Sequence, residues 1–437
     1  MEQAAVAANI RRPSVANVFL WGKRVGAVAW NPERQIAEFE YAPSFIENGS
    51  DVSPITLPRQ KGIFSFPALN PDTFRGLPGL LADSLPDRFG NALINVWLAR
   101  QGRSAEDFSP VERLCYIGSR GMGALEFKPA LVRQSTSTVP VEIAELTKLA
   151  NQVLNDREAL TVNLGDEEDA LNTIIRIGTS AGGARAKALI AWNPTTGEVR
   201  SGQVTPPPGF EQWILKFDGI SDKALGDPQG YGHIEYAYYR MAVDAGIEMK
   251  ECRLFEEGGR AHFMTRRFDR EDDGSKVHMQ SLCGIAHYDY NMPGAHGYEQ
   301  VFSVIQRLQM GYPVLDEMFR RMTFNVVARN QDYHTRNIAF LMGTDGKWRL
   351  SPAYDVTWAF NKNSPWTGMH QLSINGKRDA IVREDLMTVA KQFGIRKASD
   401  MIEQVLLTVK RWPEYANDAG VSQDQLKYIE STHLMSI

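Results

Sequence analysis

The sequence has few cysteines, and their positions exclude two kinds of covalent or metal cross-link. Cys115, Cys252 and Cys283 are widely separated along the 437-residue chain. An odd number of cysteines at such spacings fits neither a disulfide framework nor a structural zinc site. We therefore expect buried or half-buried free thiols in a reducing compartment, the cytoplasm.

Long apolar runs and an excess of one charge are also missing. No stretch approaches the roughly 20 apolar residues that a membrane-spanning helix needs, and the first residues lack the pattern of a signal peptide. The 48 basic and 52 acidic residues give a net charge of −4. Bulk charge therefore provides no attraction to nucleic acid or to a membrane. The remaining class is a folded protein of two or three domains.

Short strands dominate the pattern at the start of the chain. Residues 18–22 and 25–30 predict a hairpin around a Gly-Lys-Arg turn, and residues 39–41 alternate as a third strand would. The polar stretch 134–140 predicts a linker. This part reads as a β-rich domain.

Farther along, the pattern changes from mixed to mainly helical. It predicts strands at 188–192, 213–217 and 261–265, a helix over 234–245 that ends at Gly246, a helix around 315–326, a hairpin of 338–342 with 348–350, and helices over most of 384–437. We predict an α+β fold with the domains 1–139, 140–270 and 271–437.

Three polar residues near this hairpin have the order of a kinase catalytic centre. Asp332 and Asn337 are five positions apart on a loop that leaves a helix, and Asp355 follows the hairpin. Phosphoryl transfer needs a carboxylate beside the attacking hydroxyl and oxygen ligands for Mg²⁺. The spacing predicts that Asp332 orients or deprotonates the nucleophile and that Asn337 and Asp355 hold Mg²⁺. Taken alone, an Asp-x-x-x-x-Asn loop is more often a pair of solvated turns.

Two further segments are candidates for binding phosphate. The small residues of 180–187, which end in Lys187, allow backbone amides to approach a phosphate, although they match neither a P-loop nor a Gly-x-Gly-x-x-Gly motif. Lys216 lies among apolar strand residues, and Glu235 at the start of the next helix is its candidate partner. A lysine in such a strand is usually an edge residue with its charge in water.

Together these residues give a resemblance to a known family. The chain resembles the HipA family of serine/threonine kinase toxins of HipBA-type toxin–antitoxin modules, over nearly its whole length. The family's Asn-x-Asp-x-His-x-x-Asn signature is present at 330–337 and its Ser-Pro-Ala-Tyr-Asp motif at 351–355. Residues 18–26 and 121–127 resemble the family's N-terminal region. The resemblance implies a bilobed kinase-like fold with a β-rich N-terminal domain and a mainly helical C-terminal lobe.

The resemblance also implies roles residue by residue, with ATP and Mg²⁺ as cofactors. Asp332 is then catalytic, Asn337 and Asp355 bind Mg²⁺, and His334 and Tyr354 lie against the nucleotide. The phosphates are implied to meet Gly182, Gly183, Ala184, Arg185, Ala186, Lys187 and Lys216, and adenine to meet the strand of Arg266, Arg267 and Phe268. Ser180 matches the serine on which the family phosphorylates itself and thereby becomes inactive.

The sequence departs from the family pattern at a few of these positions. Arg185 and Ala186 stand where Gln and Glu are frequent, and Arg266 stands where Glu is common. Backbone contacts tolerate such changes, whereas side-chain contacts with ATP do not.

The implied partners are a HipB-like helix-turn-helix antitoxin, operator DNA bound mainly through it, and a protein substrate of the aminoacyl-tRNA synthetase class. Lys377 and Arg378 are a candidate DNA contact, although adjacent charges on a loop are usually just solvated.

Three other functions fit parts of the same pattern. A small-molecule phosphotransferase of the aminoglycoside type shares the Asp-x-x-x-x-Asn and Asp pattern, but it gives no reason for the N-terminal region. A catalytically silent co-repressor would not need Asp332, Asn337 and Asp355 together. A metallohydrolase that uses His287 and His334 lacks the local His-x-x-x-His spacing.

Overall fold

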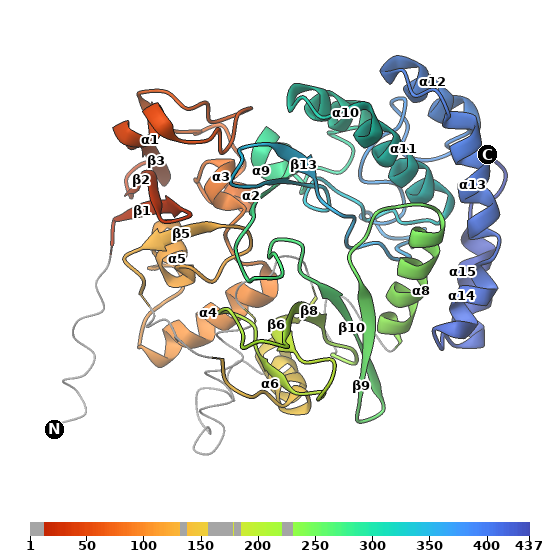
Figure 1. The fold of residues 1–437 in the computed structure, drawn as a ribbon, viewed down its shortest axis with the longest axis horizontal. Helices are drawn as coiled ribbons and strands as arrows, with labels where there is room; N and C mark the ends of the chain where they lie inside the picture. Colours follow the sequence, from red (N-terminus) through yellow and green to blue (C-terminus); the bar gives the residue numbers. More distant parts are fainter. Residues whose placement is uncertain (1–12, 132–137, 156–177, 179–184, 221–229) are drawn as a thin grey trace. The chain divides into compact units, whose positions relative to one another are not determined.

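The computed structural model of the chain describes residues 13–131, 138–155, 178, 185–220 and 230–437 (Figure 1). The chain divides into two compact units. Unit 1 comprises Met1–Ser53, Leu57–Gln229 and Phe255–Met279, and unit 2 comprises Pro54–Thr56, Gly230–Leu254 and Gln280–Ile437.

The first sheet of unit 1 is built from five antiparallel strands in the order β4-β3-β2-β1-β5. They are β1 (Val15–Leu20), β2 (Lys23–Asn31), β3 (Ile36–Tyr41), β4 (Ile63–Phe64) and β5 (Leu125–Lys128). The predicted hairpin and third strand are confirmed, but the turn is Trp21–Gly22, because Leu20 pairs with Lys23. Trp21 and Gly22 both have a positive φ, of 49° and 78°, which suits a two-residue hairpin loop.

Helices accompany this sheet, among them two in the stretch 77–100, where the sequence has a helical pattern. They are α1 (Pro43–Asn48), α2 (Pro71–Phe74), α3 (Gly79–Ala82), α4 (Arg88–Arg100) and α5 (Pro110–Ile117). Asp87 begins α4 by accepting a hydrogen bond from the Gly90 amide. Ser109 and Glu112 form a capping box at the start of α5. These caps satisfy amides that the first turn of a helix leaves without partners.

A second five-stranded sheet has the order β7-β6-β8-β10-β9. Its strands are β6 (Lys187–Trp192), β7 (Val199–Ser201), β8 (Glu211–Lys216), β9 (Cys252–Glu257) and β10 (Arg260–Arg266). The helix α6 (Ile143–Asn155) precedes them in the chain. The three strands predicted for this region are confirmed.

One hydrophobic core joins α4, α6 and this second sheet. Phe89 and Leu93 of α4 pack in the same buried cluster as Ala150 of α6 and Trp213 and Leu215 of β8. An apolar helix face needs another apolar surface to cover it, and here a helix from before residue 139 covers a sheet from after it. The division into the domains 1–139, 140–270 and 271–437 stays a prediction.

Unit 2 is mainly helical. Its helices are α8 (Tyr231–Asp244), α9 (Leu282–Ala286), α10 (Tyr298–Arg307), α11 (Tyr312–Val327), α12 (Arg383–Phe393), α13 (Ala398–Val409), α14 (Trp412–Asp418) and α15 (Gln423–Thr432). A three-stranded sheet has the order β11-β12-β13, and its strands are β11 (His278–Ser281), β12 (Ala339–Met342) and β13 (Trp348–Leu350). The first residues of β11 belong to unit 1. In Figure 1, α8 (green) has α13 and α14 (blue) beside it. Gly246, at φ 85°, follows the end of α8 as predicted.

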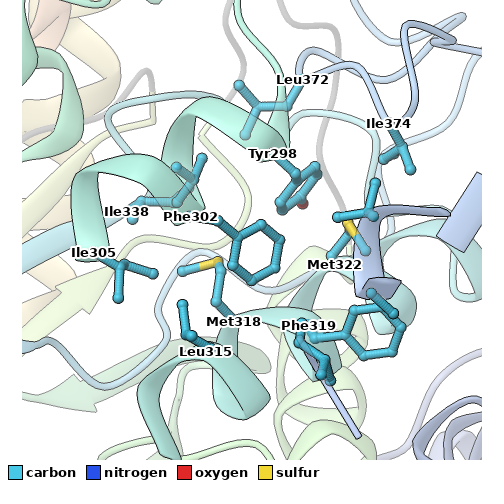
Figure 2. Close-up of a cluster of buried hydrophobic side chains, with 14 of the residues drawn as sticks. Tyr298, Phe302, Ile305, Leu315, Met318, Phe319, Met322, Ile338, Leu372 and Ile374 are labelled. Atoms are coloured by element: carbon cyan, nitrogen blue, oxygen red, sulfur yellow. The ribbon is translucent and has the colours of Figure 1, made fainter. Parts of the chain in front are cut away.

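The core of unit 2 determines where the polar loop after α11 ends. Figure 2 shows Phe302 of α10 among Met318, Phe319 and Met322 of α11, with Ile338 in the same cluster. The helix predicted around 315–326 is confirmed, and its residues from Arg321 to Val327 are all buried, some in this cluster and others, such as Phe324, in a second one. Ile338 follows directly after the predicted metal ligand Asn337, so packing of the core fixes the end of that loop.

The cysteines agree with the expectation from composition. Cys115, Cys252 and Cys283 are free and buried. Within the described ranges, no helix has both the length and the apolarity to cross a membrane.

Burial also affects the histidines, of which His278 is the clearest case. Its ring is fully buried in unit 1, and its Nε2 lies 2.9 Å from the carbonyl oxygen of Val52. Burial lowers the pKa of His278 to about 4, below the value of about 6.5 in an unfolded chain. The associated stability is therefore fully present above about pH 6.5 and is lost as the pH falls toward 4.

We predict that His278→Gln weakens the dependence of stability on pH. The glutamine amide can still donate to Val52 but cannot take up a proton. Between pH 7 and pH 5, the free energy of unfolding should fall by about 2 kcal/mol less in the variant than in the wild type. Urea unfolding at both pH values measures this difference.

The same replacement at His233, a half-buried residue of α8, controls for the loss of a histidine as such. If His278→Gln and the wild type lost the same free energy on acidification, the account of His278 would be wrong.

Candidate active site

The loop that carries Asp332 is anchored to the end of α11 by buried amides. The Asn325 side chain accepts from Asn330 Nδ2 at 2.9 Å and donates to the hydroxyl of Tyr298 at 2.9 Å. The backbone amide of Asn330 also donates to the carbonyl of Asn325. Buried hydrogen bonds of this kind hold one backbone path, because breaking them would leave polar groups unsatisfied.

The loop then closes on itself between Asp332 and Asn337. The Asn337 amide Nδ2 donates to the carbonyl oxygen of Asp332 at 3.2 Å, and the Asn337 backbone N–H donates to the carbonyl of His334 at 2.8 Å. Since the amide nitrogen is used inside the loop, the amide oxygen is the atom of Asn337 that suits a cation. The structure thus brings Asp332 and Asn337 together, as the sequence predicted.

Asp355 lies on a second loop with an unusual backbone conformation. Its φ is +54°, in the left-handed region that non-glycine residues rarely adopt. The preceding residue joins the two loops, because the Tyr354 hydroxyl donates to the carbonyl of Arg336 at 2.6 Å. Directly after β13, the carbonyl of Ser351 accepts a hydrogen bond from Arg321 Nη2 at 2.9 Å. These two contacts tie the segment just before Asp355 to the Asp332 loop and to α11.

His334 is a neutral residue in this arrangement. Burial lowers its pKa to about 4, although the nearby carboxylate of Asp355 acts in the opposite direction. Its ring centroid lies 5.3 Å from that of Tyr290. A neutral, flat ring beside the loop fits the predicted contact with a nucleotide, which no contact in the structure tests.

Sequence reasoning missed one residue that touches the predicted catalytic carboxylate. The indole Nε1 of Trp366 donates a short hydrogen bond to Asp332 Oδ1. Trp366 lies in a loop rich in Asn, Ser and Pro, 34 residues beyond Asp332. A tryptophan in such a polar loop indicates that its side chain contacts another part of the protein, but the sequence does not indicate which residue it contacts.

The oxygens of Asn337 and Asp355 suit Mg²⁺ in their chemistry. Mg²⁺ takes hard oxygen ligands, often one or two from the protein, and completes its shell with water and phosphate oxygens. Among the described residues, no three His, Cys, Asp or Glu side chains converge on a point. A protein-only metal cage is therefore not part of the described chain, whereas a site shared with a nucleotide needs no such cage.

The predicted phosphate-binding lysines lie in unit 1 and are neighbours across two strands. Lys187 of β6 pairs directly with Lys216 of β8, so both side chains emerge on the same face of the sheet. Lys216 Nζ lies 5.6 Å from the ring centroid of Phe263 on the next strand. Two like charges at directly opposite positions repel each other, so this pair requires a nearby anion, whether a carboxylate or a phosphate.

Lys187 has a carboxylate partner that the sequence did not reveal. Its Nζ lies 3.8 Å from Asp87 Oδ2, and both side chains are only 4% exposed. Asp87 is also the N-cap of α4. The sequence Leu-Pro-Asp-Arg-Phe-Gly signals a helix start, but nothing in it indicates a lysine one hundred positions later.

Of the predicted adenine-binding residues, Arg267 is the most firmly held. Its guanidinium makes two hydrogen bonds with Asp269, of 2.9 and 2.8 Å, and its backbone N–H donates to Gln212. Arg266 pairs with Asp272 at 3.1 Å and with Glu211 at 3.6 Å. Phe268, which follows Arg267 in the chain, has a half-buried side chain. The two arginine side chains and the Arg267 amide are thus engaged within unit 1, and the contact with adenine stays a prediction.

Part of the predicted phosphate loop lies outside the described residues, namely Ser180, Gly182, Gly183 and Ala184. Arg185 is half-buried, and the carbonyl of buried Ala186 accepts from the amide of Phe217. The predicted pair of Lys216 and Glu235 joins unit 1 to unit 2, and it stays a prediction.

The two residues considered for DNA binding are engaged inside unit 2. Lys377 Nζ lies 2.9 Å from Asp385, and Arg378 Nε donates to the carbonyl of His370 at 2.7 Å. Burial lowers the pKa of Arg378. Both contacts compete with a phosphate for these cations, and the DNA role stays a prediction.

Comparison with known families decides which one the chain is part of. The pattern of the HipA-like C-terminal domain matches residues 179–412, and that of the HipA N-terminal domain matches residues 16–128. The chain belongs to the HipA family. The first pattern spans both the segment of Lys187 and Lys216 and the loops of Asp332 and Asp355, and the second spans the first sheet.

A curated relative of this HipA-family chain is a Haemophilus influenzae protein described as a "putative kinase". It is 27% identical over 173 residues, which are 34% of this chain and 50% of the relative. The chain therefore spans about half the length of that curated relative.

Solved structures show the same fold. The HipA toxin of Shewanella oneidensis, determined with HipB and its operator DNA, matches with a TM-score of 0.67 over 95% of both chains at 15% identity. The α+β kinase-like fold predicted from the sequence is confirmed by this likeness. The Helicobacter pylori kinase CtkA matches 51% of this chain and 88% of its own at 14% identity, with a TM-score of only 0.33.

We predict that Asp87→Asn destabilises unit 1 strongly. Asparagine is as good an N-cap as aspartate, so the start of α4 survives while the charge that faces Lys187 is lost. A buried lysine without its carboxylate costs about 3 kcal/mol of unfolding free energy. Chemical unfolding of the purified variant measures the loss.

The control is Asp424→Asn, an exposed aspartate in the first turn of α15, which should change stability by less than about 0.5 kcal/mol. Equal stabilities of the two variants would show that the contact between Asp87 and Lys187 contributes nothing.

Proposed function

We propose that this chain is an ATP- and Mg²⁺-dependent protein serine/threonine kinase that acts as the toxin of a toxin–antitoxin pair. One observation carries the proposal: the loop closed by Asn337 onto Asp332 is joined to the loop of Asp355 by the hydrogen bond from Tyr354 to Arg336. This arrangement holds a candidate base and two candidate metal ligands on adjacent, fixed segments. The order of these parts along the chain is that of a kinase catalytic centre.

In this proposal, the residues of unit 2 position the acceptor and the metal. The acceptor hydroxyl attacks the γ-phosphorus, the bond from that phosphorus to the bridging oxygen breaks, and ADP leaves with the electron pair. Asp332 takes the hydroxyl proton. Mg²⁺ held by Asn337 and Asp355 would neutralise the charge that develops on the phosphate oxygens. His334, which is neutral, adds a flat surface without a competing charge.

Unit 1 supplies the remaining contacts in the proposal. Lys216 and Lys187 provide cations for the phosphates, which their side-by-side places on β8 and β6 support. The backbone of Arg266, Arg267 and Phe268 meets adenine. The phosphate loop extends through Gly182, Gly183 and Ala184, and autophosphorylation at Ser180 switches the enzyme off.

The partners of the proposal follow from the family and from the Shewanella complex. That structure holds a HipA toxin with HipB and operator DNA. We propose a HipB-like antitoxin for this chain too, with repression of their own operon by the pair. The protein substrate is of the aminoacyl-tRNA synthetase class, and the site of action is the cytoplasm, where free thiols such as the three of this chain persist.

We predict that Asp332→Asn abolishes phosphate transfer while the fold survives. The amide oxygen can still accept the hydrogen bond of Trp366, but it cannot take a proton at neutral pH. After incubation with radiolabelled ATP and Mg²⁺, labelling should fall by at least about 100-fold. Mass spectrometry should find phosphate on Ser180 in the wild type and none in the variant. The intact mass of the starting protein is measured first, because a molecule already phosphorylated at Ser180 would also be inactive.

The matched control is Asp345→Asn, an exposed aspartate in the β12–β13 turn, which should label like the wild type. Labelling of Asp332→Asn at the wild-type rate would remove Asp332 from the mechanism. If no protein were labelled but a sugar hydroxyl of an aminoglycoside were, the small-molecule phosphotransferase would replace the kinase.

A further inference from the structure

Trp366 is held against Asp332 by a loop that is closed on itself. The amide of Gly368 donates to the carbonyl of Ser364 at 2.9 Å, and the Ser364 hydroxyl accepts from the amide of Trp366 at 3.1 Å. A Cβ at Gly368 would lie 2.6 Å from the Ser364 carbonyl oxygen, so only glycine allows this close approach. The loop therefore has a definite shape, and that shape presents the indole.

The same loop is tied to the residue that precedes Asp332. The backbone amide of Gln371 donates to the carbonyl of Gln331 at 3.1 Å, while the Gln371 side chain donates to the carbonyl of Trp366. The Gln331 amide, with its nitrogen toward Thr367, donates to the Thr367 carbonyl at 2.7 Å. Asp332, Gln331, Gln371 and Trp366 thus form a closed ring of bonded contacts. The indole and the carboxylate cannot move apart without breaking this ring.

The chemistry of the contact limits what Trp366 can do. An indole N–H only donates, so it stabilises the charged form of a carboxylate and cannot accept the proton of a hydroxyl. The ring also meets His334, with centroids 6.4 Å apart at 71°, which restricts its rotation. A carboxylate whose Oδ1 is held in this way presents Oδ2 in one direction.

We propose that Trp366 is a positioning residue, which fixes the Asp332 carboxylate so that Oδ2 faces the acceptor hydroxyl. This inference rests on the proposed role of Asp332 as the group that takes the hydroxyl proton. The indole is a permanent part of the working site and not an inhibitory plug. Removing its N–H therefore slows the chemical step and leaves nucleotide binding unchanged.

Two substitutions separate the N–H from the packing of the ring. Trp366→Phe keeps an aromatic ring and loses the donor, whereas Trp366→Ala loses both. Steady-state kinetics with ATP should give a kcat that is about ten- to hundredfold lower for Trp366→Phe, the range expected for one hydrogen bond to a charged group. The KM for ATP should stay within about twofold. Trp366→Ala should lower kcat at least as much.

Trp358→Phe is the matched control, because the half-buried Trp358 also donates its indole N–H, to Thr432 at 3.0 Å in the same unit. It should keep the wild-type kcat. Melting temperatures of all variants show whether any loss reflects unfolding.

Each outcome decides between the readings. A wild-type kcat in Trp366→Phe with a loss only in Trp366→Ala would show that the ring merely packs, and it would overturn the inference while the kinase stands. A higher kcat in Trp366→Phe would make the indole an inhibitory plug, which also overturns it. A wild type whose intact mass shows no phosphate and which still transfers none to any acceptor would overturn the proposed function itself.

Discussion

The fully buried carboxylate of Asp269 is the interaction on which unit 1 depends. It accepts hydrogen bonds from Arg267 at 2.9 and 2.8 Å, from Arg270 at 2.8 Å and from the Gly123 amide at 2.7 Å. Burial alone would raise the pKa of Asp269, but the two arginines and this amide hold it well below its usual range. A buried charge is tolerated only when it is compensated as completely as this. The carboxylate thereby fixes a turn of the N-terminal part to the segment that carries Arg267.

In unit 2 the path from packing to chemistry is short. The apolar side of α11 sets the position of its last turn, and Asn325 on that turn fixes Asn330. From there, hydrogen bonds within the loop and to its neighbours determine where Asp332 and Asn337 lie. Each step uses hydrogen-bonded polar groups, most of them buried, so the site inherits the rigidity of the core. This rigidity is what a phosphotransfer site requires, because its catalysis comes from positioning and from fixed charges.

The sequence predicted the local features well and the long-range contacts poorly. The α11 stripe, the β12–β13 strands and the spacing of Asp332 to Asn337 follow from periodicity and local motifs, which depend on neighbours in the chain. The bonds of Trp366 to Asp332 and of Asp87 to Lys187 join residues 34 and 100 positions apart, and such contacts leave no periodic signal. The prediction of the first turn is wrong by one residue, because Gly22 marks a turn in the sequence whereas Trp21 shows no such signal and yet adopts a positive φ.

The most direct test of the account is a crystal structure of the chain soaked with Mn²⁺ and a non-hydrolysable ATP analogue. Mn²⁺ replaces Mg²⁺ at oxygen sites and gives an anomalous signal. The account predicts an anomalous peak about 2 Å from the side-chain oxygens of both Asn337 and Asp355, with the γ-phosphate beside Asp332. A nucleotide bound with its metal elsewhere, or no metal at Asn337 and Asp355 when the nucleotide is fully bound, would contradict it.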